Sequence, residues 1–199
     1  MPATVREGTA ISELYVIAGL GNPGEEYAKT RHNAGFRVVD LLSQQVGARY
    51  WKKECGSLTA KGSYRDIDVV LAKPQSFMNT SGGPVKSVLS TYKVKPDHLI
   101  VIHDELDIPA GTVKVKFGGG HDGHNGLRSI CDKLCTREWF RVRCGIGRPP
   151  GRMKVADFVL SEPKKQAEEE FEAAIDLASQ AALSLMVVGL AKTQARFGG

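Results

Sequence analysis

A chain of 199 residues suits one large domain, and a hydrophobic content of 42% is enough to build a core. The four cysteines follow no disulfide-framework spacing, which excludes a disulfide-stapled secreted scaffold and predicts reduced thiols in the cytoplasm. The sequence has no N-terminal apolar leader and no apolar run suited to crossing a bilayer, so a membrane protein is not expected.

The net charge of +5 is unevenly distributed along the chain. Residues 49–154 hold 19 Lys and Arg against 10 Asp and Glu, a net +9, whereas the remaining residues hold 8 against 12, a net −4. A regional basic excess favours a polyanionic partner, with nucleic acid as the first candidate. A solvated basic surface would explain the charge alone equally well.

The first predicted elements are a tail, a strand and a turn. Residues 1–13 are polar and mixed in charge, and we expect a flexible tail. Residues 14–18 form an apolar run that predicts a buried strand, and a turn at residues 19–24 leads to His32, just before a helical pattern. Strand, turn and a histidine at a helix entrance are how an α/β protein places chemistry above its sheet.

The same turn matches the dinucleotide-binding pattern G-x-G-x-x-G, but its surroundings argue against a nucleotide. Pro23 has no N–H to offer a pyrophosphate, and Glu25 and Glu26 add negative charge. Helical periodicity begins only at Asn33. A nucleotide-dependent oxidoreductase is a distant alternative, which a cofactor-binding titration would test.

The rest of the chain alternates between strands and helices. We predict helices over residues 33–46, 82–92, 127–134 and 164–188, with Asn33 and Ser81 as N-caps of the first two and Gly189 as the end of the last. Strands are predicted over residues 57–64, 67–73, 98–103, 113–117 and 140–145, the first two joined in a hairpin. This pattern predicts a single three-layer α/β domain over residues 14–199, with a mixed sheet and helices on both faces.

Two residues are candidates for acid–base chemistry. Asp104 follows the central strand, and a carboxylate bonded to one nitrogen of His32 would leave the other nitrogen as a base. No nucleophilic Ser or Cys stands at a signature position, so the pair suggests a base that activates water. A structural histidine at a helix N-terminus is the alternative, and the residues alone favour it.

Three loop asparagines, Asn22, Asn79 and Asn125, are candidate binding residues. Amide groups can donate to a carbonyl and to the oxyanion that develops from it. Turn and cap chemistry is the alternative, and Asn125, just before a helix, is the most cap-like of the three.

The chain holds one pattern of histidines and cysteines that could suggest a metal site. His121 and His124 precede Cys131 and Cys135, but Cys131 falls in an apolar helical stripe, so neither a metal nor another cofactor is expected.

The basic pairs Lys114/Lys116 and Arg141/Arg143 each share one face of a strand, which would suit phosphates. With few aromatic residues nearby, this predicts recognition of the nucleic-acid backbone, although exposed faces of edge strands are the alternative.

Five motifs then occur in order between residues 14 and 190. They are Gly-Leu-Gly-Asn22-Pro-Gly with Tyr27 and Thr-Arg-His32-Asn-Ala-Gly; Lys-Pro with Phe77-Met78-Asn79-Thr-Ser-Gly; His103-Asp104-Glu-Leu-Asp; Gly-Gly-Gly-His-Asp-Gly-His124-Asn125-Gly-Leu-Arg; and Arg141-Val-Arg143-Cys-Gly-Ile-Gly-Arg-Pro. With these motifs the chain resembles the bacterial peptidyl-tRNA hydrolases.

The resemblance implies cleavage of the ester that joins a peptide to the 3′ end of tRNA, by one catalytic α/β domain with a twisted mixed sheet. It implies a monomer that needs no metal. It places His32 as the base that activates water and Asp104 as the carboxylate that holds it. Asn22 corresponds to the residue that tells a blocked peptidyl group from a free aminoacyl group, and Asn79 and Asn125 would bind the peptide and position the reacting groups.

For the substrate, the resemblance implies a groove lined by Tyr27, Phe77 and Met78. Lys116 and Arg143 match the family's clamp on the tRNA 5′ phosphate. Lys114 and Arg141 are basic neighbours of this clamp, and Lys114 is expected to bind tRNA with it.

The chain departs from the family pattern in two places. Asp122 stands where a small residue is usual, and would weaken the local attraction for phosphate. The ending at residues 194–199 lacks the usual asparagine. A non-catalytic RNA-binding relative, such as the plastid splicing factors of this fold, is the second reading, and intact His32, Asp104 and Asn79 argue against it.

Overall fold

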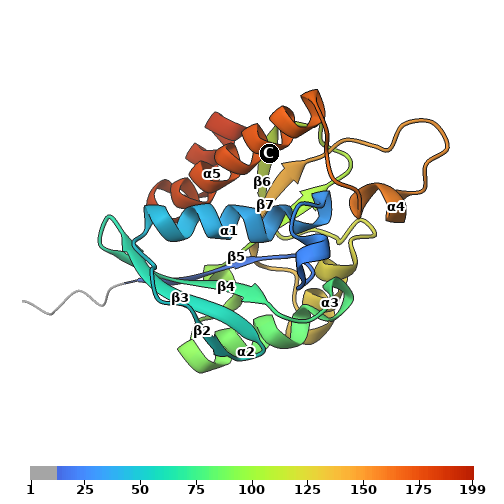
Figure 1. Ribbon diagram of the computed structural model, residues 1–199. Helices are drawn as coiled ribbons and strands as arrows, with labels where there is room; N and C mark the ends of the chain where they lie inside the picture. The colour runs from blue at the N-terminus through green and yellow to red at the C-terminus, as the bar shows by residue number, and fades with distance from the viewer. Residues whose placement is uncertain (1–12) are drawn as a thin grey trace, which may run out of the picture.

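The computed structural model describes residues 13–199, so the tail expected at residues 1–13 lies, apart from Glu13, outside the described residues. In the described chain, seven strands form one sheet in the order β2-β3-β4-β1-β5-β7-β6 (Figure 1). The strands are β1 (Leu14–Gly19), β2 (Lys52–Glu54), β3 (Ser57–Tyr64), β4 (Ile67–Pro74), β5 (Leu99–Glu105), β6 (Val113–Phe117) and β7 (Phe140–Gly145). The four central strands, β4, β1, β5 and β7, are parallel, and the strands at both edges pair antiparallel. The predicted mixed sheet is therefore confirmed.

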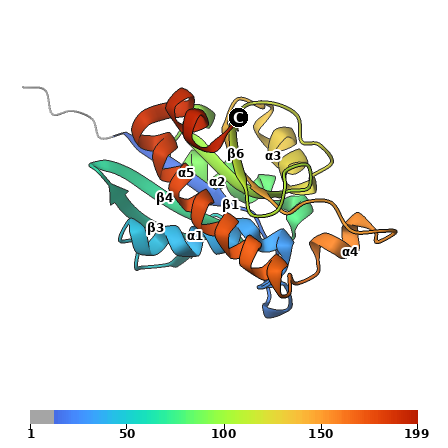
Figure 2. The same ribbon diagram turned by 90° about the horizontal axis from the view of Figure 1, so that it is seen from above.

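Helices cover both faces of this sheet. They are α1 (Ala34–Gln45), α2 (Gly82–Tyr92), α3 (Asn125–Leu134), α4 (Val155–Val159) and α5 (Gln166–Phe197). α1 and α5 lie on one face and α2 and α3 on the other (Figure 2). A core of buried apolar side chains lies under each pair of helices. This three-layer arrangement confirms the predicted fold class.

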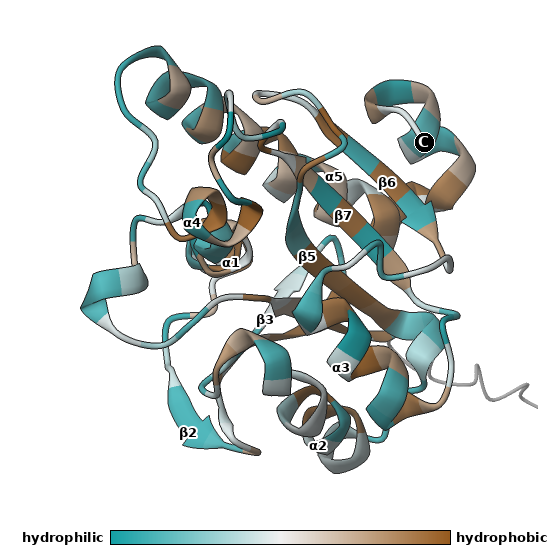
Figure 3. Ribbon diagram, turned by 90° about the vertical axis from the view of Figure 1, so that its right-hand side faces the viewer, coloured by the Kyte–Doolittle hydropathy of each residue, from teal (hydrophilic) through white to brown (hydrophobic). Residues whose placement is uncertain are grey.

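The burial of each strand follows from what covers it. All of β5 is buried, and Figure 3 shows it hydrophobic through most of its length. Near the edge of the sheet, β6 and β7 alternate between hydrophilic and hydrophobic residues, because one of their faces is less covered. The carboxyl ends of β1, β4 and β5 share one edge of the sheet, and polar loops begin there.

Several local predictions were wrong or incomplete. Ser81 does not cap α2, because it has helical backbone angles and its hydroxyl donates to the Met78 carbonyl oxygen at 2.8 Å. Gly189 does interrupt the last helix, with φ 79° and ψ −178°, but helical backbone resumes after it and reaches Phe197. Neither β2, with three residues, nor α4, with five, was predicted, since both are too short for a periodic signal.

The C-terminal segment covers an edge of the sheet. Gln194 Nε2 donates to the Val115 carbonyl oxygen at 3.1 Å, and the Val115 N–H donates to the Gly198 carbonyl oxygen at 3.0 Å. Partners of this kind stop β6 from presenting an open strand edge.

One described helix, α5, is long and apolar enough to cross a membrane by length and composition alone, contrary to the expectation from the sequence. Half of its most apolar window is buried. It packs on α1, β6 and β7, as the core helix of a soluble protein does.

The end of β1 packs against the start of α1 through two glycines, Gly19 and Gly35. A Cβ added to Gly35 would lie 2.2 Å from the Leu20 nitrogen and 2.4 Å from the Ile102 oxygen, both backbone atoms. We therefore expect Gly35→Ala to lower the free energy of unfolding by about 3 kcal/mol or more, because the backbone atoms just after β1 and within β5 cannot move enough to relieve the overlap. Urea denaturation of Gly35→Ala and Gly83→Ala measures this.

Gly83 is the matched control, because its added Cβ would meet nothing within 4 Å. Gly83→Ala should be neutral or slightly stabilising. Equal stability of the two variants would show that the close approach at Gly35 is not required by the fold.

Candidate active site

A cleft of about 660 Å³ opens at the sheet edge where β1, β4 and β5 end. Asn22 and Asn79, which follow β1 and β4, line it together with Asp104, which lies within β5 beside its last residue and not after the strand as expected. Loop residues before and at the start of α3 and apolar residues of α4 complete its walls. The full lining comprises Asn22, His32, Phe77, Met78, Asn79, Asp104, Glu105, Leu106, Asp122, Gly123, His124, Asn125, Arg148, Val155, Ala156, Val159 and Leu160.

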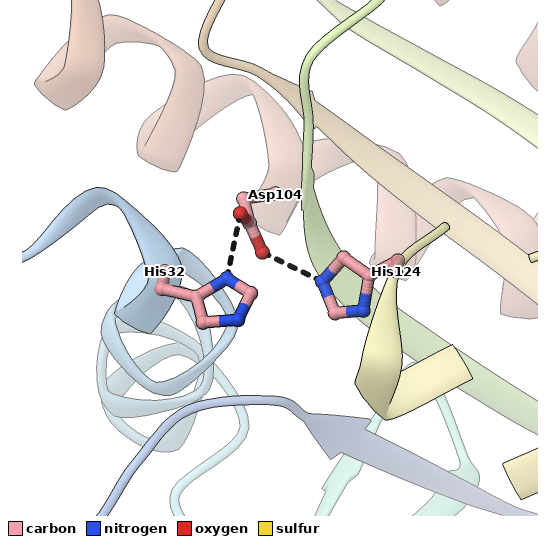
Figure 4. Close-up of side chains that lie close together, drawn as sticks. All are labelled: His32, Asp104 and His124. Carbon is pink, nitrogen blue, oxygen red and sulfur yellow. Dashed lines mark hydrogen bonds and ion pairs between the residues drawn. The ribbon is translucent and has the colours of Figure 1, made fainter. Parts of the chain in front are cut away.

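At the base of this cleft, Asp104 lies between two histidines (Figure 4). His32, in the short 3₁₀ turn η2 (Arg31–Asn33), has its Nδ1 2.8 Å from Asp104 Oδ2. His124, just before α3, has its Nε2 2.8 Å from Asp104 Oδ1. Both oxygens of a carboxylate with a 2% exposed side chain are thus used. The sequence pattern suggested the His32–Asp104 pair, but not that His124 completes it.

The hydrogen bonds assign the protons of this cluster. His124 Nδ1 accepts from the N–H groups of Gly126 and Leu127 at 3.2 and 3.3 Å, so its proton sits on Nε2 and is donated to Asp104. His124 is therefore the N-cap of α3, the role that the sequence suggested for Asn125. His32 donates Nδ1–H to the carboxylate, which leaves its Nε2 without a hydrogen-bond partner in the described chain.

The electrostatics of the cluster favour an ionised Asp104. Burial alone raises the pKa of this carboxyl, but the two histidines and their hydrogen bonds outweigh burial and hold the pKa well below its usual range. Burial lowers the pKa of His32, and the charge and hydrogen bond of Asp104 reverse this, so that the net pKa is raised. His32 is thus an imidazole oriented by a buried anion, with one nitrogen free to accept a proton.

Asn22 is fixed in one orientation by its neighbours. Its Oδ1 accepts from the Met78 N–H at 2.7 Å, so its Nδ2 carries the two N–H donors that remain at the cleft. Asn33 holds the Asn22 backbone from both sides, since its Oδ1 accepts from the Asn22 N–H at 2.9 Å and its Nδ2 donates to the Asn22 carbonyl at 3.0 Å. The predicted N-cap role of the Asn33 side chain was therefore wrong. That side chain makes no cap hydrogen bond to α1 and instead bonds the backbone of the turn after β1.

The remaining candidates for the groove divide into lining and supporting residues. Phe77, which is 59% exposed, and buried Met78 line the cleft beside exposed Asn79 and Asn125. Tyr27 does not line it, but packs edge-on against Phe77 with ring centroids 6.4 Å apart. On α4 and just after it, Val155 and Leu160 expose apolar side chains to the cleft, a wall that the sequence did not predict.

The four basic residues of β6 and β7 do share one face, because Lys114 pairs in register with Arg143 and Lys116 with Arg141. Arg141 is not a surface cation, however. It is fully buried, its guanidinium donates to the carbonyl oxygens of Gly119 and Gly120, and it stacks 3.9 Å over the Trp139 ring. The expectation that Arg141 lies on a phosphate-facing surface was therefore wrong. Its guanidinium instead holds the loop before α3 that contains Gly119 and Gly120.

The other three cations keep partial access to solvent, and two of them lie near carboxylates. Arg143 Nε is 3.6 Å from Glu105 Oε2, and Lys116 Nζ is 3.7 Å from Asp122 Oδ2. Burial and the neighbouring arginines lower the pKa of Lys116. β7 is the direct neighbour of β5, so this basic face adjoins the strand that carries Asp104.

Three or more His, Cys, Asp or Glu side chains could hold a metal ion where their ligand atoms lie close together. Among the described residues, one cluster meets this condition: His32, Asp104 and His124, whose ligand atoms lie within 4.8 Å of one another. In this cluster, His32 Nδ1 and His124 Nε2 are each already hydrogen-bonded to an oxygen of Asp104. The pattern of His121, Cys131 and Cys135 does not come together as a cluster in this part of the chain.

A doubly wound sheet, a cleft at the ends of its parallel strands and a histidine held by a buried carboxylate define the class as an α/β enzyme suited to activating water. A family model described as "Peptidyl-tRNA hydrolase" matches residues 16–199. The chain belongs to the peptidyl-tRNA hydrolase family, a family of enzymes.

Bacterial relatives and a solved structure agree with this family. The chain is 50% identical over 183 residues to a peptidyl-tRNA hydrolase of Frankia casuarinae, covering 92% of this chain and 93% of that protein. It is 46% identical over 191 residues to one of Streptomyces coelicolor, covering 92% and 94%. The crystal structure of the peptidyl-tRNA hydrolase of Acinetobacter baumannii matches with a TM-score of 0.86 at 35% identity, over 96% of this chain and 98% of that one.

Proposed function

We propose that this chain hydrolyses the ester bond between peptide and tRNA in peptidyl-tRNA, releasing free tRNA and an N-blocked peptide. The observation that carries this proposal is the hydrogen bond from His32 Nδ1 to buried Asp104, which leaves Nε2 free in a cleft large enough for the end of the substrate. Membership of the family supports the substrate.

In the proposed reaction, His32 Nε2 takes a proton from water as the water oxygen attacks the ester carbonyl carbon. The carbonyl oxygen becomes an oxyanion, and amide N–H donors such as those of Asn22 and Asn79 can bind it. The intermediate collapses, the bond to the 3′ ribose oxygen breaks, and that oxygen receives the proton from His32. Asp104 stays ionised and stabilises the imidazolium through its charge and hydrogen bond.

Asn22 would select the blocked substrate by its hydrogen-bonding pattern. Only its two N–H donors remain at the cleft, since Oδ1 is held by Met78. An N-acylated residue offers a carbonyl oxygen that can accept from them, whereas a free α-ammonium offers only further donors and a positive charge. Asn79 and Asn125 would bind the peptide, and Phe77 and Met78 would line its path with support from Tyr27.

The basic face would bind the acceptor stem of tRNA, with Lys116 and Arg143 on the 5′ phosphate and Lys114 beside them. Asp122 lies close enough to Lys116 to compete with that phosphate. We expect Asp122→Asn to tighten tRNA binding by about two- to fivefold, the range of an exposed ion pair, when binding is measured by fluorescence titration at several salt concentrations.

Asp66→Asn is the matched control for that titration. It makes the same charge change at another residue with positive φ, in the turn between β3 and β4. Equal effects of the two substitutions would mean that only net charge matters, and that Asp122 does not act on the basic face.

The proposal extends to the state of the protein. We infer one catalytic domain over residues 14–199 that acts as a monomer in the cytoplasm and needs no metal ion. One sheet with a continuous core on each face supports the single domain. Sedimentation velocity at micromolar concentration tests the monomer, and activity in a chelator tests the absence of a metal requirement.

The reaction is tested by incubating the protein with an N-acetyl-aminoacyl-tRNA in water enriched in ¹⁸O. Attack by water on the acyl carbon places one ¹⁸O atom in the carboxylate of the released amino acid and none in the tRNA. Binding of the tRNA without release would instead favour a non-catalytic RNA-binding relative.

A further inference from the structure

Arg31 lies one residue before His32 and joins η2 to a segment 130 residues further along the chain. Its backbone N–H donates to the Ser161 carbonyl oxygen at 3.2 Å, and its Nη1 donates to Ser161 Oγ at 2.7 Å. Its guanidinium carbon lies 4.3 Å from the centroid of the Phe158 ring. Three contacts from one half-buried side chain and its backbone thus converge on the C-terminal end of α4.

α4 depends on these contacts. It is a five-residue helix without a side-chain N-cap, and Figure 1 shows it on a loop at one end of the molecule. Ser161 Oγ also donates to the Phe158 carbonyl oxygen at 2.6 Å, which closes the C-terminal end of the helix. Within the described chain, the hydrogen bonds that residues 154–161 receive from outside that segment come from Arg31 alone.

The face that α4 presents to the cleft is apolar. Val155, Ala156 and Val159 line the cleft with Leu160, and Val155 and Leu160 are 41% and 45% exposed. Exposed aliphatic side chains facing a cleft are suited to bury apolar groups of a ligand. A peptide supplies such groups, whereas the ribose and phosphates of tRNA do not.

We propose that Arg31 is a positioning residue that fixes α4 as the wall for apolar side chains of the peptide. This inference rests on the proposed function. The turn η2 carries both His32, which bonds Asp104, and Arg31, which bonds the segment just after α4. Two adjacent residues therefore fix the position of α4 relative to the imidazole of His32. Loosening Arg31 therefore weakens binding of bulky apolar residues and leaves the chemical step in place.

The test compares one tRNA charged with N-acetyl-glycine or N-acetyl-leucine. Arg31→Met keeps an unbranched apolar stem over Phe158 and removes the hydrogen bonds of the guanidinium, while the backbone N–H of residue 31 can still donate to the Ser161 carbonyl oxygen. We expect it to raise KM for the leucine substrate about tenfold, because a pocket distinguishes aliphatic groups by this order, and to change KM for the glycine substrate less than about twofold. The kcat for both substrates should stay within about threefold of wild type.

Two further variants make the test decisive. Ser161→Ala removes the hydroxyl that accepts from Arg31 Nη1 and donates to the Phe158 carbonyl oxygen, and should give a smaller effect of the same pattern even if Arg31→Met fails to fold. Arg37→Met is the matched control, because Arg37 also pairs with an acceptor on another helix, Glu172, and lies 6.0 Å from a phenylalanine ring, but outside the cleft. It should change neither KM.

Two outcomes would overturn the inference while wild type remains active. They are an equal loss of kcat on both substrates, which would show a general structural role, and an unchanged KM for the leucine substrate in both Arg31→Met and Ser161→Ala. Failure of wild type to cleave either substrate would instead contradict the proposed function.

Discussion

Replacing His32 with alanine should lower kcat for an N-acetyl-aminoacyl-tRNA by about 10²–10⁴-fold, the usual contribution of a general base. The reason is geometric, since His32 is the cleft residue whose imidazole is oriented by Asp104 with Nε2 left free. Rapid-quench measurement of a single turnover isolates this step. The fold should survive, because His124 still donates to Asp104.

His98→Ala is the control for that variant. His98 also lies 2.9 Å from a carboxylate, that of Asp97, but on the surface before β5 and outside the cleft. Its removal should leave kcat unchanged. A His32→Ala variant that turns over near the wild-type rate would remove His32 from the role of base.

The pH dependence of kcat/KM gives a second view of His32. A base must be neutral to act, so activity should rise with pH and level off above the raised pKa of His32, which lies above the usual 6.5. Because the pKa of His32 is higher in the folded protein than in the unfolded chain, protonation of His32 stabilises the folded protein below pH 6.5. This stabilisation is lost as the pH rises through the pKa of His32 in the folded protein. Asp104→Asn removes the charge that raises the pKa of His32, so the rise of kcat/KM with pH should occur at lower pH.

Asn22→Asp should have the second largest effect, on selectivity. The aspartate can still accept from the Met78 N–H, but it presents an acceptor where Asn22 presents donors. We expect kcat/KM for the blocked substrate to fall by about 10²-fold, as for loss of one donor to a reacting carbonyl. The rate on unblocked aminoacyl-tRNA relative to the blocked one should rise.

Competition between the two substrates in one reaction measures that ratio directly. Asn22→Ala serves as the comparison, because it removes the donors without adding an acceptor and should lower activity without improving the relative rate on the free amine. An unchanged ratio in Asn22→Asp would mean that another residue discriminates against the free α-ammonium.

The central layer of the fold could be predicted because its signals are local. β1 and β5 are apolar runs buried on both faces, and the β3–β4 hairpin turns at Arg65 and Asp66, both with positive φ. Short elements such as α4 carry no periodic signal, and Gly189 has a backbone conformation that normally ends a helix, so the helical segment beyond it was missed.

The site was only partly predictable because its pairs are distant in sequence. His32 and Asp104 are 72 residues apart, so the residues alone suggested their pairing only as one of two alternatives, and the resemblance to a family was needed to favour it. The hydrogen-bonding roles of His124 and Asn33 were missed, because a histidine or asparagine near a helix start has several possible partners. The tertiary fold decides which of these partners it bonds. Arg141 looked like a surface cation since strand alternation says which face a side chain is on, but not what covers that face.

The most direct test of the whole account is a side-by-side assay of N-acetyl-aminoacyl-tRNA and the unblocked aminoacyl-tRNA with wild-type protein in the presence of a chelator. The account predicts rapid cleavage of the blocked substrate alone, with the same rate with and without chelator. Cleavage of neither substrate by folded protein that still binds tRNA, or cleavage that the chelator abolishes, would contradict water activation by His32 and Asp104 alone.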